Sequence, residues 1–160
     1  MTLDQIDRRI LRYLAVQGRA TVQHVADAAG LSQSACSRRI QALETRGIIA
    51  GYGARFGAAA LGRPVTVLVN ISLSSQAESL LERFEAAVAE IDGVISCHLV
   101  SGEYDYHLRI LCRDLGDYER LHREHLGQLP GVTRINSTFT LREVPTRGEA
   151  AALFGSTGGK

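Results

Sequence analysis

The segment LSQSACSRRIQALETRG, residues 31–47, decides the fold of the N-terminal part of the chain. Ser32 is a good N-cap because its hydroxyl can accept a hydrogen bond from a free amide of the first helical turn. Gly47 can end the helix because glycine adopts the left-handed C′ conformation at little cost. The apolar residues between them recur at steps of four and three and form one helical stripe: Cys36, Ile40 and Leu43. The segment therefore predicts an amphipathic helix.

The opposite face of this helix carries hydroxyl, amide and guanidinium groups and no acid before Glu44. These groups hydrogen-bond base edges and phosphates in DNA complexes, although a merely solvated face is the alternative interpretation. Arg39 flanks the apolar stripe and could instead pair with Asp4 or Asp7. The expected DNA-contacting residues are Thr21, Ser32, Gln33, Ser34, Ser37, Arg38, Arg39 and Gln41.

Two further helices are expected before this one. The first follows a capping box of Thr2 and Gln5 and ends before Gly18. The second begins at Thr21 and ends at Gly30. Two short helices joined by a glycine-containing turn form a helix-turn-helix, so the N-terminal part is expected to be a helix-turn-helix domain.

The chain after the third helix is expected to contain a junction between two domains. Residues 48–53 are rich in apolar residues and predict a short strand, which could form the wing of a winged helix-turn-helix. Glycine and proline then break the pattern. We expect a helix-turn-helix domain over residues 1–52, a strand and linker over 53–64, a second domain over 65–144 and a flexible tail over 145–160.

The second domain begins with strict alternation of apolar and polar residues, which predicts a strand with one buried face. The expected elements are a strand at 65–73, a helix opened by a Ser75/Glu78 capping box and closed by Gly93, strands at 94–100 and 104–112, a helix capped by Asp114, and a strand at 132–144. This order is the ferredoxin-like βαββαβ arrangement. The whole chain is therefore expected to be an α+β protein.

One face of such a sheet is covered by the two helices, and the other is open. The open face is expected to be largely apolar, with Leu68, Val100 and Leu111 among its residues. An exposed apolar face usually has a partner. We therefore expect a homodimer that pairs through the sheets.

Composition narrows the class of protein. No apolar run approaches the roughly 20 residues that a membrane-spanning helix needs, and the N-terminus lacks the basic and apolar pattern of a secretion signal. Cys36, Cys97 and Cys112 lie in apolar segments and are expected to be free thiols in a reducing cytoplasm. Residues 1–63 hold nine Arg and four acids, whereas residues 64–160 hold nine basic residues and thirteen acids. The basic first half is expected to meet a polyanion.

The chain resembles the Lrp/AsnC family of transcription regulators over about residues 2–144. The matching stretches are Leu3-Asp4-x-x-Asp7-x-x-Ile10-Leu11, residues 31–49, Gly102-Glu103-Tyr104-Asp105-Tyr106 and Leu129-Pro130-Gly131-Val132. The resemblance implies an N-terminal DNA-binding domain that reads a palindromic operator, and a C-terminal domain that senses a small effector, expected to be an amino acid. It also implies dimers that often assemble into octamers, in a cytoplasmic, nucleoid-associated protein.

The turn at residues 102–106 is the expected effector site. Asp105 can accept hydrogen bonds from an ammonium group, and Gly102 lets the backbone approach a ligand closely. The alternative is a tight hairpin turn whose aromatic residues fill the core. The expected effector-binding residues are Gly102, Glu103, Tyr104, Asp105, Thr138 and Thr140, which could meet at one rim of the sheet or across subunits.

Other functions are weaker alternatives. His122 and His125 flank Glu124 at a spacing that can bind metal on a helix, but a metal site needs three or four converging ligands. No metal, cofactor or enzymatic activity is expected. Sirohaem decarboxylases look similar to this family, so the fold alone does not exclude an enzyme. A nucleoid-organising protein with little sequence preference is a further alternative.

Overall fold

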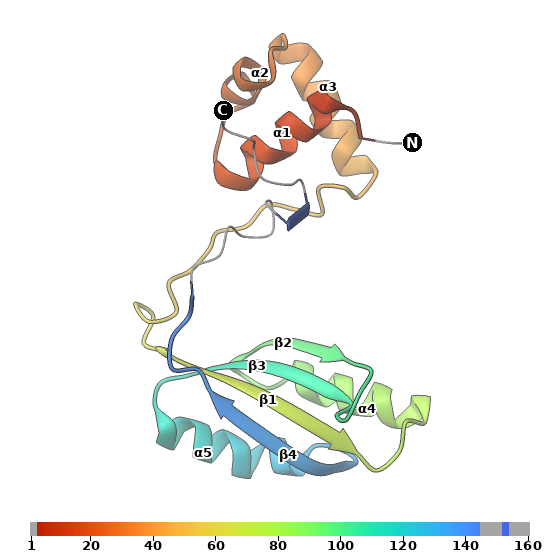
Figure 1. Cartoon of the computed structure of the whole chain (residues 1–160), viewed down its shortest axis with the longest axis vertical. Helices are drawn as coiled ribbons and strands as arrows, with labels where there is room; N and C mark the ends of the chain where they lie inside the picture. Colours follow the sequence, from red (N-terminus) through yellow and green to blue (C-terminus); the bar gives the residue numbers. More distant parts are fainter. Residues whose placement is uncertain (1–2, 145–151, 154–160) are drawn as a thin grey trace. The chain divides into compact units, whose positions relative to one another are not determined.

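The computed structural model describes residues 3–144 and 152–153, so Thr2 and almost all of the expected tail lie outside the described residues (Figure 1). The chain divides into two compact units. One unit holds the three N-terminal helices, and the other is Phe56–Glu143. Each unit is described by itself.

The N-terminal unit is the expected helix-turn-helix domain. Its helices are α1 (Gln5–Val16), α2 (Val22–Ala29) and α3 (Gln33–Thr45). The hydroxyl of Thr21 accepts from the amide of His24, and the hydroxyl of Ser32 accepts from the amide of Ala35 at 3.3 Å. Both predicted caps are therefore confirmed. The buried apolar residues of the three helices share one core: Ile10, Leu11, Val25, Ala26, Ala29, Cys36 and Leu43.

The start of α1 differs from the prediction. The Asp4 carboxylate accepts from the amide of Asp7 at 2.7 Å, and the Asp7 carboxylate accepts from the amide of Asp4 at 3.4 Å. The capping box is thus made by Asp4 and Asp7, and the predicted box of Thr2 and Gln5 is wrong. Aspartate caps as well as threonine does, and these two carboxylates have a further partner on α3.

The predicted wing is also wrong, because residues 46–64 form no strand. Gly47 lies in the left-handed region at φ +67°. The amide of Ile48 donates to the carbonyl of Leu43, and that of Gly47 donates to Glu44, both at 2.9 Å. These are the two hydrogen bonds of a Schellman cap. Ile48 and Ile49 then pack against the helical core, so their apolar character serves the end of α3 and not a strand.

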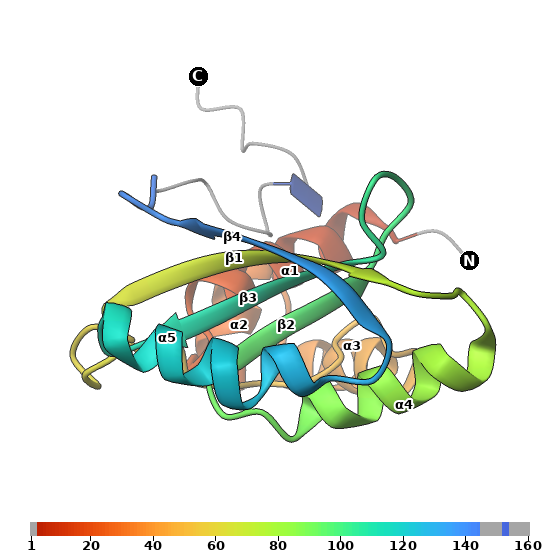
Figure 2. The same ribbon diagram turned by 90° about the horizontal axis from the view of Figure 1, so that it is seen from below.

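The unit Phe56–Glu143 has the expected ferredoxin-like fold. Its elements are β1 (Val65–Leu73), α4 (Glu78–Ala89), β2 (Val94–Leu99), β3 (Tyr106–Cys112), α5 (Leu115–Glu124), the 3-10 turn Leu126–Gln128 and β4 (Val132–Phe139). The strands form one antiparallel sheet in the order β2-β3-β1-β4. Figure 2 shows α4 and α5 on the same face of this sheet.

The core of this unit lies between the sheet and its two helices. The predicted alternation is confirmed on β1 and β3, because every second residue is buried. Phe84 of α4 packs on Tyr106 of β3 with ring centroids 4.4 Å apart. The most deeply buried residues are Val67, Val69, Ile71, Phe84, Val88, Tyr106, Leu108, Ile110, Cys112 and Leu126. Cys36, Cys97 and Cys112 are free, as expected, although Cys97 is only half-buried.

Two predicted boundaries are wrong in this unit. Ser75 accepts from the amide of Ala77 at 3.1 Å, and α4 starts after Ala77 without a side-chain cap. The last strand ends at Phe139 and does not reach residue 144. Thr140 donates its amide to Thr66, next to the first residue of β1. Because β4 runs antiparallel to β1, it has no β1 residue to pair with beyond this point, and the ladder of hydrogen bonds ends.

The open face of the sheet is mixed and not largely apolar as expected. Strand register places Leu68 and Leu111 there, and Val100 lies outside the strands. Leu68 is 46% exposed. The other residues of this face are mostly polar: Thr66, Asn70, His98, His107, Arg109, Asn136 and Thr138. His107 and Asn70 hydrogen-bond each other across β1 and β3.

Candidate DNA-binding and effector-binding sites

The exposed face of α3 carries the predicted DNA-contacting residues. Gln33, Ser34, Ser37, Arg38 and Gln41 are all exposed, whereas the apolar stripe of the same helix faces the core. Within residues 3–144 no acidic side chain pairs with Arg38. The face therefore presents one guanidinium with two amides and two hydroxyls, which suits contacts with base edges and phosphates.

Thr21 and Ser32 stand at the N-termini of α2 and α3. Their hydroxyl oxygens accept from backbone amides, and the Ser32 hydroxyl also lies 3.4 Å from that of Ser34. Both residues remain exposed. Their established role in this structure is to cap the helices, and a cap leaves the hydroxyl proton available to another acceptor.

Arg39 has a structural role. Its Nη1 donates to Asp4 Oδ2 and to Asp7 Oδ1, both at 2.7 Å. The amide of Asp7 and then the Arg39 guanidinium hold the pKa of Asp4 below its usual value. Asp7 is only 8% exposed, so this guanidinium stabilises a buried carboxylate while it ties α3 to α1. The alternative interpretation of Arg39, pairing with the first helix, is confirmed.

The turn between β2 and β3, residues 100–105, is anchored at the end of β1. Asp105 Oδ2 accepts from the amide of Leu73 at 2.7 Å, and Oδ1 accepts from the Gln76 side chain at 2.8 Å. The Asp105 amide donates to the carbonyl of Ile71. Both carboxylate oxygens thus have partners within the chain. This geometry gives Asp105 a part in positioning the turn.

Three side chains meet on the outer side of this turn. Arg134 Nη1 lies 3.0 Å from Glu103 Oε1, and its guanidinium carbon lies 5.3 Å from the centroid of the Tyr104 ring. Arg134 was not predicted as a site residue. It is an arginine on the polar side of the last strand, but only its pairing with Ser72 at the end of β1 places it beside the turn.

The other two predicted effector residues lie far from the turn within one chain. Thr138 pairs with Leu68, and Thr140 donates to Thr66. Thr140 directly follows β4 and lies six residues after Arg134, which corresponds to roughly 20 Å at the usual rise of a strand. The structure therefore does not bring Thr138 and Thr140 together with residues 102–105 in one subunit. Of the two arrangements expected from the sequence, only a meeting across subunits remains.

No group of three or more His, Cys, Asp or Glu side chains in residues 3–144 and 152–153 could hold a metal ion. No described helix has the length and apolar character that crossing a membrane requires.

Comparisons with known proteins identify both units. Residues 3–44 match the AsnC-type helix-turn-helix domain, and residues 66–150 match the Lrp/AsnC ligand-binding domain. The Bkd operon transcriptional regulator of Pseudomonas aeruginosa is 38% identical over 91% of this chain and 95% of that protein. The leucine-responsive regulatory protein of Escherichia coli is 37% identical over 89% of this chain and 87% of that protein.

A solved structure has a similar fold. The chain resembles a transcriptional regulator from Neisseria meningitidis, solved as an L-Met complex, with a TM-score of 0.86 and 30% identity. The match covers 91% of this chain and 94% of that one. The two matched domains, the two similar regulators and the Neisseria meningitidis structure all indicate the same family. The chain belongs to the Lrp/AsnC family of transcription regulators.

Proposed function

We propose that this regulator binds a specific palindromic operator through α3 and adjusts its occupancy in response to an amino acid. The observation that carries the proposal is the exposed, arginine-containing face of α3 in a helix-turn-helix. Direct contacts come from Arg38, Gln33, Ser34, Ser37 and Gln41. Thr21 and Ser32 add contacts to DNA at the N-termini of α2 and α3. Arg39 holds α3 against α1 through Asp4 and Asp7.

A palindromic operator requires a two-fold symmetric protein. We assign the dimer contact to the open face of the sheet, where Leu68 and Leu111 can pack against their copies. The polar neighbours of these leucines, such as Asn70 and Arg109, can hydrogen-bond across the same contact. Assembly of such dimers into octamers is carried over from the family.

The effector site is proposed at the turn between β2 and β3. An amino acid has an ammonium group and a carboxylate. Glu103 and Arg134 are exposed and offer one charge of each sign, 3.0 Å apart. The backbone at Gly102 is open, since a Cβ placed there would meet no atom within 4 Å. Tyr104 supports the Arg134 guanidinium, and Asp105 holds the turn on β1. Thr138 and Thr140 would come from another copy of the chain.

The relatives indicate the chemical class of the effector, but not which compound it is. The relative from Neisseria meningitidis was solved with L-Met, and the Escherichia coli relative is named for its response to leucine. We therefore propose an apolar amino acid as the first candidate. The protein would act as a cytoplasmic, nucleoid-associated regulator and not as an enzyme.

The test begins with selection of binding sites from a random DNA library. The selected operator and random DNA are then titrated at several salt concentrations. A regulator should prefer its operator at least a thousandfold, whereas equal affinities would favour the nucleoid-organising alternative. A haem-like absorption band in the purified protein would favour the enzyme alternative.

The effector is sought in a thermal-shift screen with all the proteinogenic amino acids, because a ligand that binds the folded state raises its stability. Any amino acid that stabilises the protein is added to the operator titration. A change in operator affinity supports the proposal. If no amino acid changes either stability or operator affinity, the amino-acid response is rejected.

A further inference from the structure

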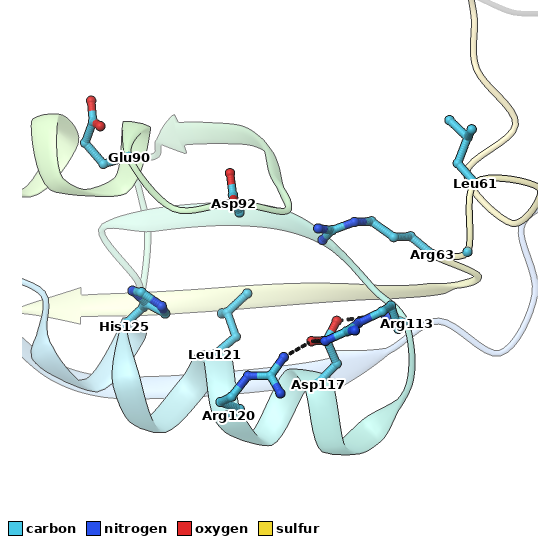
Figure 3. Close-up of a pocket in the computed structure, with 10 residues that line it drawn as sticks. Leu61, Arg63, Glu90, Asp92, Arg113, Asp117, Arg120, Leu121 and His125 are labelled. Carbon is cyan, nitrogen blue, oxygen red and sulfur yellow. Dashed lines mark hydrogen bonds and ion pairs between the residues drawn. The ribbon is translucent and has the colours of Figure 1, made fainter.

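A cavity lies at the opposite end of β1 from the turn at residues 100–105. Its volume is about 520 Å³, within the usual range for small-molecule sites. It lies between the residues that lead into β1, the connection from α4 to β2, and the face of α5 (Figure 3). All of these belong to the unit Phe56–Glu143. The predicted effector residues do not line it.

Arg63 forms one wall and is held in place. Its Nη1 donates to the carbonyl of Leu111 at 3.1 Å. Gly93 lies beneath it at φ +95°, and a Cβ at this position would stand 2.9 Å from the guanidinium nitrogen and 2.8 Å from the Leu111 oxygen. Glycine at position 93 therefore leaves room for the guanidinium. Figure 3 shows it pointing into the space between Asp92 and the side chains of α5.

The α5 wall also carries positive charge. Asp117 accepts from both Arg113 and Arg120, so one carboxylate serves two guanidinium groups. Hydrogen bonds from the Arg113 side chain and backbone hold the pKa of Asp117 well below its usual range, and the carboxylate stays ionised. Together with Arg63 this side of the cavity has three arginines and one acid, which leaves an excess of positive charge.

The facing wall is acidic. Glu90 and Asp92 come from the connection between α4 and β2, and both are exposed. Among the described residues neither has a cationic partner, and no ion pair crosses the cavity between the two walls. Carboxylates and guanidinium groups thus line the same cavity, and no ion pair joins the two sets.

We propose that this cavity binds a small zwitterion, with its anionic end at Arg63 and Arg120 and its cationic end at Glu90 and Asp92. A ligand with a single charge would be attracted by one wall and repelled by the other. A ligand with both charges pairs with both walls, and charge-assisted hydrogen bonds are the strong ones. The largely polar lining suits such a ligand better than an apolar one. The site is distinct from the proposed effector turn.

The experiment uses a series of zwitterions that differ only in the distance between the charges. Glycine, β-alanine, γ-aminobutyrate and ε-aminocaproate are titrated into the full chain by calorimetry. Hexanoate and hexylamine serve as probes with a single charge. At least one zwitterion should bind about tenfold or more tightly than either single-charge probe. If none does, the proposal is wrong.

Variants then locate the binding. Asp92→Asn and Arg120→Gln each remove one charge from a wall and should weaken the best zwitterion about tenfold or more. Arg120→Lys keeps the charge and should stay within about threefold of wild type. The matched controls are Glu82→Gln on α4 and Arg123→Gln on α5, which are exposed and do not line the cavity. Equal binding by Asp92→Asn, Arg120→Gln and the controls would overturn the assignment.

Discussion

Arg38 and Arg39 are neighbours on α3, yet the structure predicts opposite consequences for their replacement by alanine. Arg38 is exposed and has no acidic partner among the described residues, whereas Arg39 holds Asp4 and Asp7. We expect Arg38→Ala to weaken operator binding without lowering stability. We expect Arg39→Ala to lower the stability of the helical unit.

The size of the Arg38 effect follows from symmetry. One arginine contact with a base or phosphate contributes about 1–3 kcal/mol. A dimer on a palindrome makes the contact twice, so the loss is about 2–6 kcal/mol, and the Kd rises by a factor of roughly thirty at the least. If the contact is to phosphate, the slope of log K against log salt should fall by about two for the dimer.

The assay is fluorescence anisotropy with the selected operator and with random DNA at several salt concentrations. Arg123→Ala is the matched control, because Arg123 is an exposed arginine of α5 in the other unit. A folded Arg38→Ala variant whose operator Kd stays within about threefold of wild type would refute the proposed role of the α3 face.

Arg39→Ala leaves the buried carboxylate of Asp7 without its guanidinium. The cost should lie between that of a surface ion pair and that of a buried one, about 1–2 kcal/mol for the Asp7 contact, because Arg39 is itself 35% exposed. Thermal unfolding followed by circular dichroism should show a Tm lower by on the order of 5–10 °C. An unchanged Tm would contradict the role of Arg39 in joining α3 to α1.

Three further predictions concern the unit Phe56–Glu143. Arg134→Gln should weaken effector binding about tenfold or more in calorimetry, while operator affinity without effector stays within about threefold, and an unchanged effector Kd would exclude Arg134 from the site. A fragment of residues 56–144 should still dimerise in sedimentation at micromolar concentration, and a folded monomer would show that the open sheet face is not the dimer contact. Gly93→Ala should destabilise the unit by about 2–4 kcal/mol in chemical unfolding, because it combines a strained φ with a backbone clash. Gly62→Ala, where φ is also positive but a Cβ has no atom within 4 Å, should cost only about 1–2 kcal/mol, and equal costs would argue against the clash.

Local signals predicted the helix-turn-helix almost completely. Ser32 caps α3, Gly30 ends α2 in the left-handed region, and Gly47 ends α3. These features depend on contacts within a few residues of the chain, which a sequence displays directly. The predicted wing failed because an apolar pair after a helix can serve either a strand or a Schellman cap. Only the presence or absence of a partner strand distinguishes the two.

Alternation likewise predicted the buried faces of β1 and β3, but not which side chains meet. The open face was expected to be largely apolar, and register placed Asn70, His107 and Arg109 there beside Leu68. Register also set Thr138 and Thr140 at the far end of β4 from the turn. A sequence shows the period of a strand, whereas the position of its partner depends on the packing of the whole sheet.

The sequence by itself determined the family, the order of the elements, most helix caps and the polar face of α3. Tertiary structure decided what each arginine does. Arg39 meets Asp7 across 32 residues, Arg134 meets Glu103 across 31, and Arg63 meets Leu111 across 48. The arginine side chain is long, so its guanidinium can contact whatever group the fold brings near it. Its partner is therefore set by the packing of distant segments, which no local pattern records.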